Sequence, residues 1–268
     1  MNHTIIGKPF IETGYKQIVS TEVFNNLTFG LLLLKQSQDF MYKEEEKESV
    51  FILIKGQVIF KINSKEYTTN LRRDVFVDNP SALYVPKNLD LLIKAVTDSE
   101  IVVAKAFCTD SGSEYFIPAE KVRNKYVGES NWKRQVRDVV DSSVPAQRLI
   151  VGETINLPGC WSSWPPHKHD TDDFPNELKA DELYHFRIEP TYSFALQRIY
   201  NKNIDESYVI RDGDTVITKT GYHPVVAAPG TLVYYIWVVS NEKRKFLPST
   251  DPLFTWHKNV EFMLKEKY

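Results

Sequence analysis

The sequence predicts an all-β protein with two consecutive jelly-roll barrels and a short C-terminal helix. Its apolar runs are short, rich in β-branched and aromatic residues, and separated by turn residues. This pattern begins a second time after residue 148, and only the end of the chain has apolar residues at helical spacing. We expect each group of strands to close into a barrel, because closure satisfies the edges that short strands would expose.

Short strands are expected throughout the first half. Turn candidates at Lys55-Gly56 and Asn63-Ser64 separate three of them. The expected strands cover 51–54, 57–62, 65–69, 91–96 and 101–107. A polar stretch then marks a break in composition at 109–113. We therefore predict an N-terminal barrel without a metal site over residues 1–108 and a connecting segment over 109–145.

The second half repeats this organisation, so we predict a C-terminal barrel over residues 146–268. Asp212-Gly213 is a strong tight-turn signal between two of its strands. Asp251 and Pro252 have the residue types of a helix cap and a first helical position, which predicts a helix from there to Lys267. The expected strands cover 149–155, 182–188, 194–200, 208–210, 215–218 and 232–239.

The composition argues against several classes of partner. Among 268 residues, 42% are hydrophobic and 25% charged, and the net charge of −2 gives no reason to expect nucleic acid. No apolar run approaches the roughly 20 residues of a membrane span, and no secretory signal is visible. The two cysteines, Cys108 and Cys160, lack a ligand-like spacing. We expect a cytoplasmic protein that binds a small molecule.

Four side chains of the second half form a pattern typical of a metal site. His167 and His169 are two apart, so on a strand they project to the same side. Glu182 opens the next expected strand, and His223 follows the Asp212-Gly213 turn. An isolated His-x-His is weak evidence, whereas this combination within one barrel favours a site for one divalent ion: Zn, Mn, Fe, Co or Ni.

Neighbouring polar residues have other expected roles. Lys168 should point away from the metal ligands, and Asp170 could orient one of the imidazoles. Strand parity places His185 on the face opposite Glu182, so it should look outward. His257, on the expected terminal helix, should lie at the surface.

The chain resembles the 5-deoxy-glucuronate isomerases of bacterial myo-inositol catabolism. These two-cupin proteins are related to the 4-deoxy-L-threo-5-hexosulose-uronate ketol-isomerases of pectin breakdown. The resemblance is carried by 161–170, 184–188, 194–200, 212–214 and 221–230. It implies cupin barrels, assembly into homo-oligomers of unspecified number, and isomerisation of 5-deoxy-D-glucuronate to 5-dehydro-2-deoxy-D-gluconate. The metal would act as a Lewis acid on the sugar.

The sequence departs from the family pattern in three places. Cupins usually have their glutamate a few residues after His-x-His, but here the segment 170–181 intervenes, which leaves Glu177 as an alternative to Glu182. This acidic segment is either a lid or a solvated loop. Lys219 replaces a common proline, and Phe254 stands where the family has a histidine.

Five further residues are candidates for handling the substrate. Arg198 could bind its carboxylate, because a guanidinium forms bidentate hydrogen bonds with such groups. Glu206 and Tyr208 are candidates for the catalytic base. Tyr235 and Trp237 share one strand face and could form an apolar wall for the sugar.

Three other functions fit the same pattern. A related uronate ketol-isomerase would differ only in substrate. An iron cupin dioxygenase would use the same ligands but consume oxygen. A sugar-sensing cupin would bind without turnover, although no DNA-binding helix pair or basic patch accompanies the barrels here.

Overall fold

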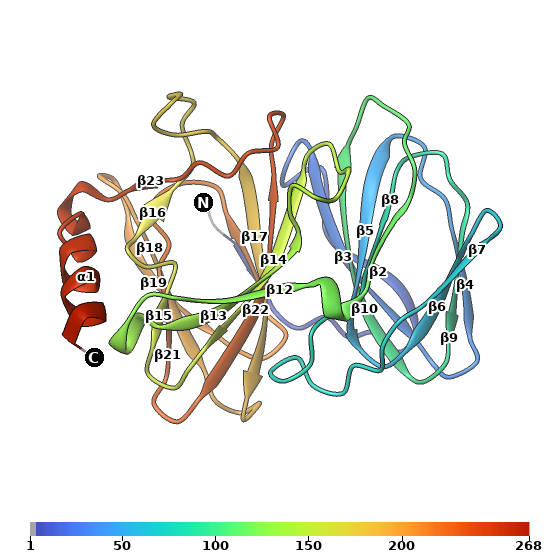
Figure 1. Ribbon diagram of the computed structural model, residues 1–268, viewed down its shortest axis with the longest axis horizontal. Coiled ribbons are helices and arrows are strands. Elements are labelled where there is room, and N and C mark those ends of the chain that lie inside the picture. The colour runs from blue at the N-terminus through green and yellow to red at the C-terminus, as the bar shows by residue number, and fades with distance from the viewer. Residues whose placement is uncertain (1–3, 268) are drawn as a thin grey trace.

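The structure, a computed structural model that describes residues 4–267, consists of two β-barrels side by side (Figure 1). Each barrel has one large and one small antiparallel sheet. The helix α1 (His257–Lys267) lies at the outer end of the C-terminal barrel (Figure 1). The predicted fold class is thereby confirmed, and every strand expected from the sequence is present, with its ends moved by a few residues. No helix in the described part of the chain is long and apolar enough to cross a membrane.

The N-terminal barrel contains two sheets. Its large sheet has six strands, in the spatial order β11 (Tyr115–Ile117), β8 (Ala82–Val85), β5 (Lys47–Lys55), β10 (Ser99–Phe107), β3 (Leu27–Leu34) and β2 (Gly14–Val19). Its small sheet has four, in the order β4 (Asp39–Tyr42), β9 (Leu91–Ala95), β6 (Val58–Ile62) and β7 (Lys65–Thr68). Gly56 in the turn between β5 and β6 has a φ of 93°, which explains the need for glycine there.

The C-terminal barrel is built in the same way. Its large sheet has the order β1 (Thr4–Ile6), β20 (Thr215–Thr218), β17 (Asp181–Glu189), β22 (Leu232–Ser240), β14 (Leu149–Asn156), β13 (Arg134–Val140) and β12 (Arg123–Val127). Its small sheet has the order β15 (Trp161–Ser162), β21 (Val225–Ala227), β18 (Ala195–Tyr200) and β19 (Asp205–Ile210). The remaining elements are the pair β16 (His167–Lys168) and β23 (Ser249–Thr250) and the 3-10 turns η1 (Ala119–Lys121), η2 (Ser130–Trp132) and η3 (Pro252–Phe254).

The two large sheets pack against each other, so their strands are buried on both faces. In β22, Val233 and Tyr235 face the interior of the C-terminal barrel, whereas Tyr234 and Ile236 face the N-terminal barrel. Because both faces are apolar, such strands appear in the sequence as continuous hydrophobic runs rather than as an alternation. A third core fills the N-terminal barrel.

Strand pairing crosses the predicted domain limits. The first strand, β1, pairs with β20 of the C-terminal barrel. The segment 109–145 is not a plain connection, because β11 joins the N-terminal sheet while β12 and β13 extend the C-terminal one. The limits at residues 108 and 146 stay a prediction, although the segment between them contributes strands to both large sheets.

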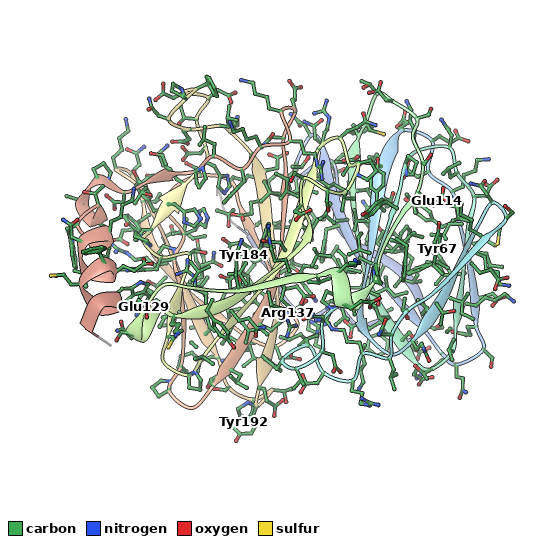
Figure 2. The ribbon with its side chains drawn as sticks, in the orientation of Figure 1. Tyr67, Glu114, Glu129, Arg137, Tyr184 and Tyr192 are labelled. Atoms are coloured by element: carbon green, nitrogen blue, oxygen red, sulfur yellow. The ribbon has the colours of Figure 1, made fainter. Side chains whose placement is uncertain are left out.

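A buried ionic network also joins the barrels. Arg72 of the N-terminal half makes two hydrogen bonds to the Glu153 carboxylate, at 2.9 and 2.8 Å. Arg137 donates to the same carboxylate at 3.1 Å, and Tyr234 donates to it at 2.8 Å. All four side chains are almost fully buried, and Figure 2 shows Arg137 between the barrels.

Two expectations about the second half are wrong, and a third is incomplete. The predicted terminal helix is interrupted: Asp251 caps the 3-10 turn η3, and the α-helix begins only at His257. His185 does point away from the barrel interior, but it is fully buried against Phe29 of the N-terminal barrel. His257 is also buried, because it packs between Trp132 and Trp164.

Candidate metal centre

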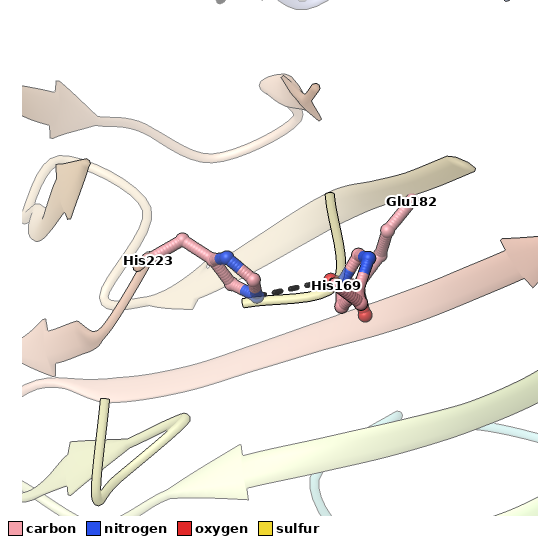
Figure 3. Close-up of side chains that lie close together, drawn as sticks. All are labelled: His169, Glu182 and His223. Carbon is pink, nitrogen blue, oxygen red and sulfur yellow. Dashed lines mark hydrogen bonds and ion pairs between the residues drawn. The ribbon is translucent and has the colours of Figure 1, made fainter. Parts of the chain in front are cut away.

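Three side chains from distant segments meet inside the C-terminal barrel. His169 follows β16, Glu182 is the second residue of β17, and His223 precedes β21. Their candidate ligand atoms lie within 4.8 Å of one another, and all three are buried (Figure 3). Glu182 Oε2 is 2.8 Å from His169 Nε2 and 3.1 Å from His223 Nε2.

Backbone carbonyl groups orient the imidazoles. The Nδ1 atom of His169 lies 3.0 Å from the Ala180 oxygen, and that of His223 lies 2.9 Å from the Gly221 oxygen. A carbonyl oxygen can only accept a hydrogen bond, so each Nδ1 carries the proton and donates it. This leaves the Nε2 lone pair of both rings directed at Glu182, an arrangement typical of metal-bound histidine.

The charges of the site call for a cation. Burial by itself would raise the pKa of Glu182, but the attraction of His169 and His223 outweighs it and lowers this pKa. Burial would lower the pKa of His169, yet the Glu182 carboxylate raises it. His223 Nε2 is buried without a hydrogen-bond partner. A carboxylate and two nitrogen lone pairs converge here, so the donor set fits a divalent metal ion.

His167 lies beside this group but is not part of it. Its ring centroid is 5.0 Å from that of His223, and its Nδ1 atom is 3.3 Å from the Pro165 oxygen. Burial, followed by repulsion from His223, lowers the pKa of His167 to about 3. A neutral imidazole can bind a metal, and His167 as the fourth ligand stays a prediction.

The acidic segment 170–181 does not supply the metal-facing carboxylate. Glu177 instead binds Lys168 at 2.8 Å and accepts two backbone N–H groups, so it is engaged away from the imidazoles. Lys168 points away from the ligands as expected, since it also pairs with Asp170. Among the described residues, Asp170 forms no hydrogen bond or ion pair with an imidazole, and its carboxylate accepts the backbone N–H of Gly221.

Aromatic side chains surround the centre. Phe246, in the loop between β22 and β23, lies with its ring centroid 5.6 Å from that of His169 and stacks on Trp237 at 6.5 Å. Tyr184 lies 6.0 Å from His223 and 4.7 Å from Tyr235 between ring centroids. The predicted aromatics Tyr235 and Trp237 are thus linked to the site through Tyr184 and Phe246, and Figure 2 shows Tyr184 inside the barrel.

The predicted carboxylate-binding arginine lies elsewhere. Arg198 neighbours the fully buried Gln197 on β18, so it projects from the opposite, outer face of that strand. It forms two hydrogen bonds to Asp205 and stacks on Tyr200. The structure does not bring Arg198 to the histidines, so this placement does not favour a role in substrate binding.

The two predicted base candidates lie on the edge strand β19. Tyr208 is opposite Gln197 in the strand register and packs against the core of the C-terminal barrel. Its hydroxyl donates to Glu206, which is exposed. Burial, followed by the Glu206 charge, raises the pKa of Tyr208 to about 12. In the described part of the chain, neither side chain forms a hydrogen bond, ion pair or ring contact with the centre.

Two buried polar groups near the centre escaped sequence reasoning. Gln197 donates its amide to the His223 oxygen at 3.4 Å, and its own Oε1 has no partner. Thr218 lies opposite Glu182 in the register, and its hydroxyl is also unpartnered. Buried polar atoms without partners are rare and indicate a missing ligand or water. No pattern in the sequence singles out Gln197, because its face is set by the register of β18 with β19 and β21.

Sequence comparison relates this chain to one family of known proteins. A model of the KduI/IolB family matches residues 12–257. The chain is 33% identical to the 5-deoxy-glucuronate isomerase of Geobacillus kaustophilus, over 89% of this chain and 88% of that protein. The protein of the same name from Geobacillus thermodenitrificans is 32% identical, over 89% of both chains.

Solved structures show the same architecture. An IolB-like protein from Salmonella typhimurium has a TM-score of 0.89 and 26% identity, covering 95% of this chain and 98% of that one. Bacillus subtilis oxalate decarboxylase has a TM-score of 0.60 at 10% identity, covering 90% of this chain and 76% of that one. This second likeness supports the two-cupin fold alone.

Proposed function

The chain belongs to the KduI/IolB family, and on this basis we propose that it is a metal-dependent isomerase of 5-deoxy-D-glucuronate. The product is the ketose 5-dehydro-2-deoxy-D-gluconate, as in the breakdown of myo-inositol. The reaction moves hydrogen between adjacent carbons without net oxidation. The observation that carries metal dependence is the convergence of His169 Nε2 and His223 Nε2 on one Glu182 oxygen.

The proposed ligands are His169, Glu182 and His223, with His167 as the fourth. Their nitrogen and carboxylate donors suit Zn, Mn, Fe, Co or Ni. When bound, such an ion supplies Lewis-acid polarisation of the substrate carbonyl.

Other side chains would bind the substrate and exclude water. Gln197 Oε1 accepts a hydrogen bond from a sugar hydroxyl, because this buried oxygen otherwise has no partner. Thr218, opposite Glu182 in the strand register, provides a second hydroxyl contact. Tyr235 and Trp237 form an apolar wall for the sugar.

We assign proton transfer to Tyr208 and Glu206, which both lie on β19. Tyr208, whose pKa is raised to about 12, is protonated at neutral pH and is the proposed proton donor. Glu206, which accepts the Tyr208 proton in a hydrogen bond, is the proposed base. Because Glu206 is exposed, this assignment requires the substrate to reach the edge of the small sheet.

Metal removal tests the proposed function. The protein is stripped with a chelator, single divalent metals are restored, and 5-deoxy-D-glucuronate is followed by proton NMR in deuterated buffer. We expect the 5-keto product only with metal, and deuterium in the product if hydrogen moves as an exchanging proton. Turnover at the full rate in metal-free protein would contradict metal dependence. Oxygen consumption upon substrate addition would point instead to a dioxygenase.

Substituting Gln197 tests the hydroxyl contact. Gln197→Leu keeps the approximate volume but removes the acceptor, and one hydrogen bond contributes about 1 kcal/mol. We expect kcat/KM to fall about fivefold while the bound metal is retained. Gln36→Leu, at an exposed position of the N-terminal barrel, is the matched control. An unchanged kcat/KM in Gln197→Leu would remove this residue from the substrate site.

A further inference from the structure

Three charged side chains form a compact cluster next to the metal centre. Lys168 Nζ lies 2.6 Å from Asp170 Oδ1 and 2.9 and 2.8 Å from the two carboxylate oxygens of Glu177. The exposed fractions of the three side chains are only 20%, 17% and 5% in that order. One lysine therefore holds together two carboxylates that would otherwise repel each other.

The Asp170 carboxylate connects this cluster to His223. Its Oδ2 atom accepts hydrogen bonds from the Thr220 hydroxyl at 2.6 Å and from the Gly221 N–H at 2.7 Å. The carbonyl group of Gly221 in turn accepts the Nδ1 proton of His223 at 2.9 Å. Asp170 thus fixes the peptide segment that orients His223, although it does not touch the ring.

The Glu177 carboxylate belongs to the segment that holds the other ligand, His169. Its Oε1 atom accepts hydrogen bonds from the backbone N–H groups of Asp170 and Thr171 at 2.7 and 2.8 Å. These bonds hold Glu177 against the beginning of the segment 170–181. The segment returns at Ala180, whose N–H donates to the His169 oxygen and whose own oxygen accepts from His169 Nδ1, both at 3.0 Å. The segment that follows the His-x-His motif therefore also holds His169 in place.

We propose that Lys168, Asp170 and Glu177 are positioning residues that set the separation of His169 and His223 and thereby the affinity for the metal. We call these three side chains the clamp, and the proposal rests on the proposed metal site. It explains why an acidic segment stands between the histidine motif and Glu182: residues 171–176 are exposed, whereas Asp170, Glu177 and Ala180 brace two ligand-bearing turns. Partners of this kind, outside the ligand set, typically change metal affinity 10- to 100-fold.

Loss of a positioning residue lowers the affinity for the metal, whereas loss of a purely structural residue lowers only the stability of the protein. All contacts of the clamp lie within 168–180 and 220–221, outside the three apolar cores. Loss of Lys168 leaves Asp170 and the buried Glu177 without their cation, so the melting temperature of the metal-free protein should fall whether or not the cluster positions the ligands. The additional stability that bound metal confers should fall, because that gain depends on metal affinity.

The test uses Lys168→Met, which removes the charge that holds the two carboxylates. Zn²⁺ affinity is measured by competition with a chelating dye, and melting temperatures are measured with and without Zn²⁺. We expect affinity to fall 10- to 100-fold in Lys168→Met and to be largely restored in Lys168→Arg. Lys179→Met is the control: it lies in the same segment, and its side chain makes no hydrogen bond or ion pair with the described residues. It should stay within twofold of wild type.

The outcomes separate the clamp from the metal site itself. Wild-type affinity in Lys168→Met would overturn the clamp while leaving the metal site intact. A lower melting temperature of metal-free Lys168→Met with unchanged affinity would also overturn it, since the cluster would then be structural only. A wild-type protein that binds no Zn²⁺, Mn²⁺, Fe²⁺, Co²⁺ or Ni²⁺ would overturn the proposed metal site and the clamp with it.

Discussion

Replacing His169 with alanine is expected to abolish metal binding and to reduce turnover to background. His169 faces Glu182 at 2.8 Å and is held through Nδ1 by the Ala180 oxygen, so the substitution removes an oriented ligand of the proposed site. The substitution also leaves the Glu182 carboxylate buried with one attractive partner fewer. We expect kcat/KM to fall more than about a hundredfold, because losing a ligand should exceed the effect of losing a partner outside the ligand set.

Metal content by mass spectrometry and the NMR assay together check this result. His257→Ala is the control, because His257 is also buried but packs between Trp132 and Trp164 instead of facing Glu182. That variant should keep its metal, even if its stability falls. Full activity of a metal-free His169→Ala protein would show that the centre is not needed for the reaction.

Replacing Glu153 with alanine should cause the largest loss of stability. The variant leaves Arg72 and Arg137 with buried guanidinium groups and no carboxylate, and it removes the acceptor of Tyr234. Removing one partner of a buried ionic group typically destabilises a protein by about 3–5 kcal/mol. We therefore expect the free energy of unfolding in urea to fall by about this amount.

An exposed ion pair provides the control for this second prediction. Glu66 pairs with Lys61 on the N-terminal small sheet, and its side chain is 57% exposed. Glu66→Ala should change the free energy of unfolding by at most about 1 kcal/mol, because solvent screens such pairs. If Glu153→Ala were equally mild, the network would not be an important connection between the barrels.

Much of the fold follows from patterns between neighbouring residues. Turn residues such as Lys55-Gly56 and Asp212-Gly213 separate the strands where they were expected. The spacing of His167 and His169 predicts that both rings lie on one side, and both rings do face His223, with centroid distances of 5.0 and 5.2 Å. These features depend on backbone geometry within a few residues, so the sequence contains the necessary information.

Other features depend on which strands pair and which sheets pack. His185 was expected to point outward, and it does leave the barrel interior, but only the N-terminal barrel makes that face a buried one. Arg198 could not be assigned to a face because strand parity has meaning only relative to a known neighbour. The register with β19 and β21 supplies that neighbour and places Gln197 inward instead.

The sequence by itself determined the strand-rich fold, its repetition and the residue types of the candidate metal centre. Only the tertiary structure decided that Glu182 rather than Glu177 meets the imidazoles and that Lys168, Asp170 and Glu177 form one cluster beside them. Periodicity and turn chemistry act between residues close in sequence, whereas this convergence requires a barrel that closes. Its closure depends on the register of strands far apart in the chain, which no local pattern encodes.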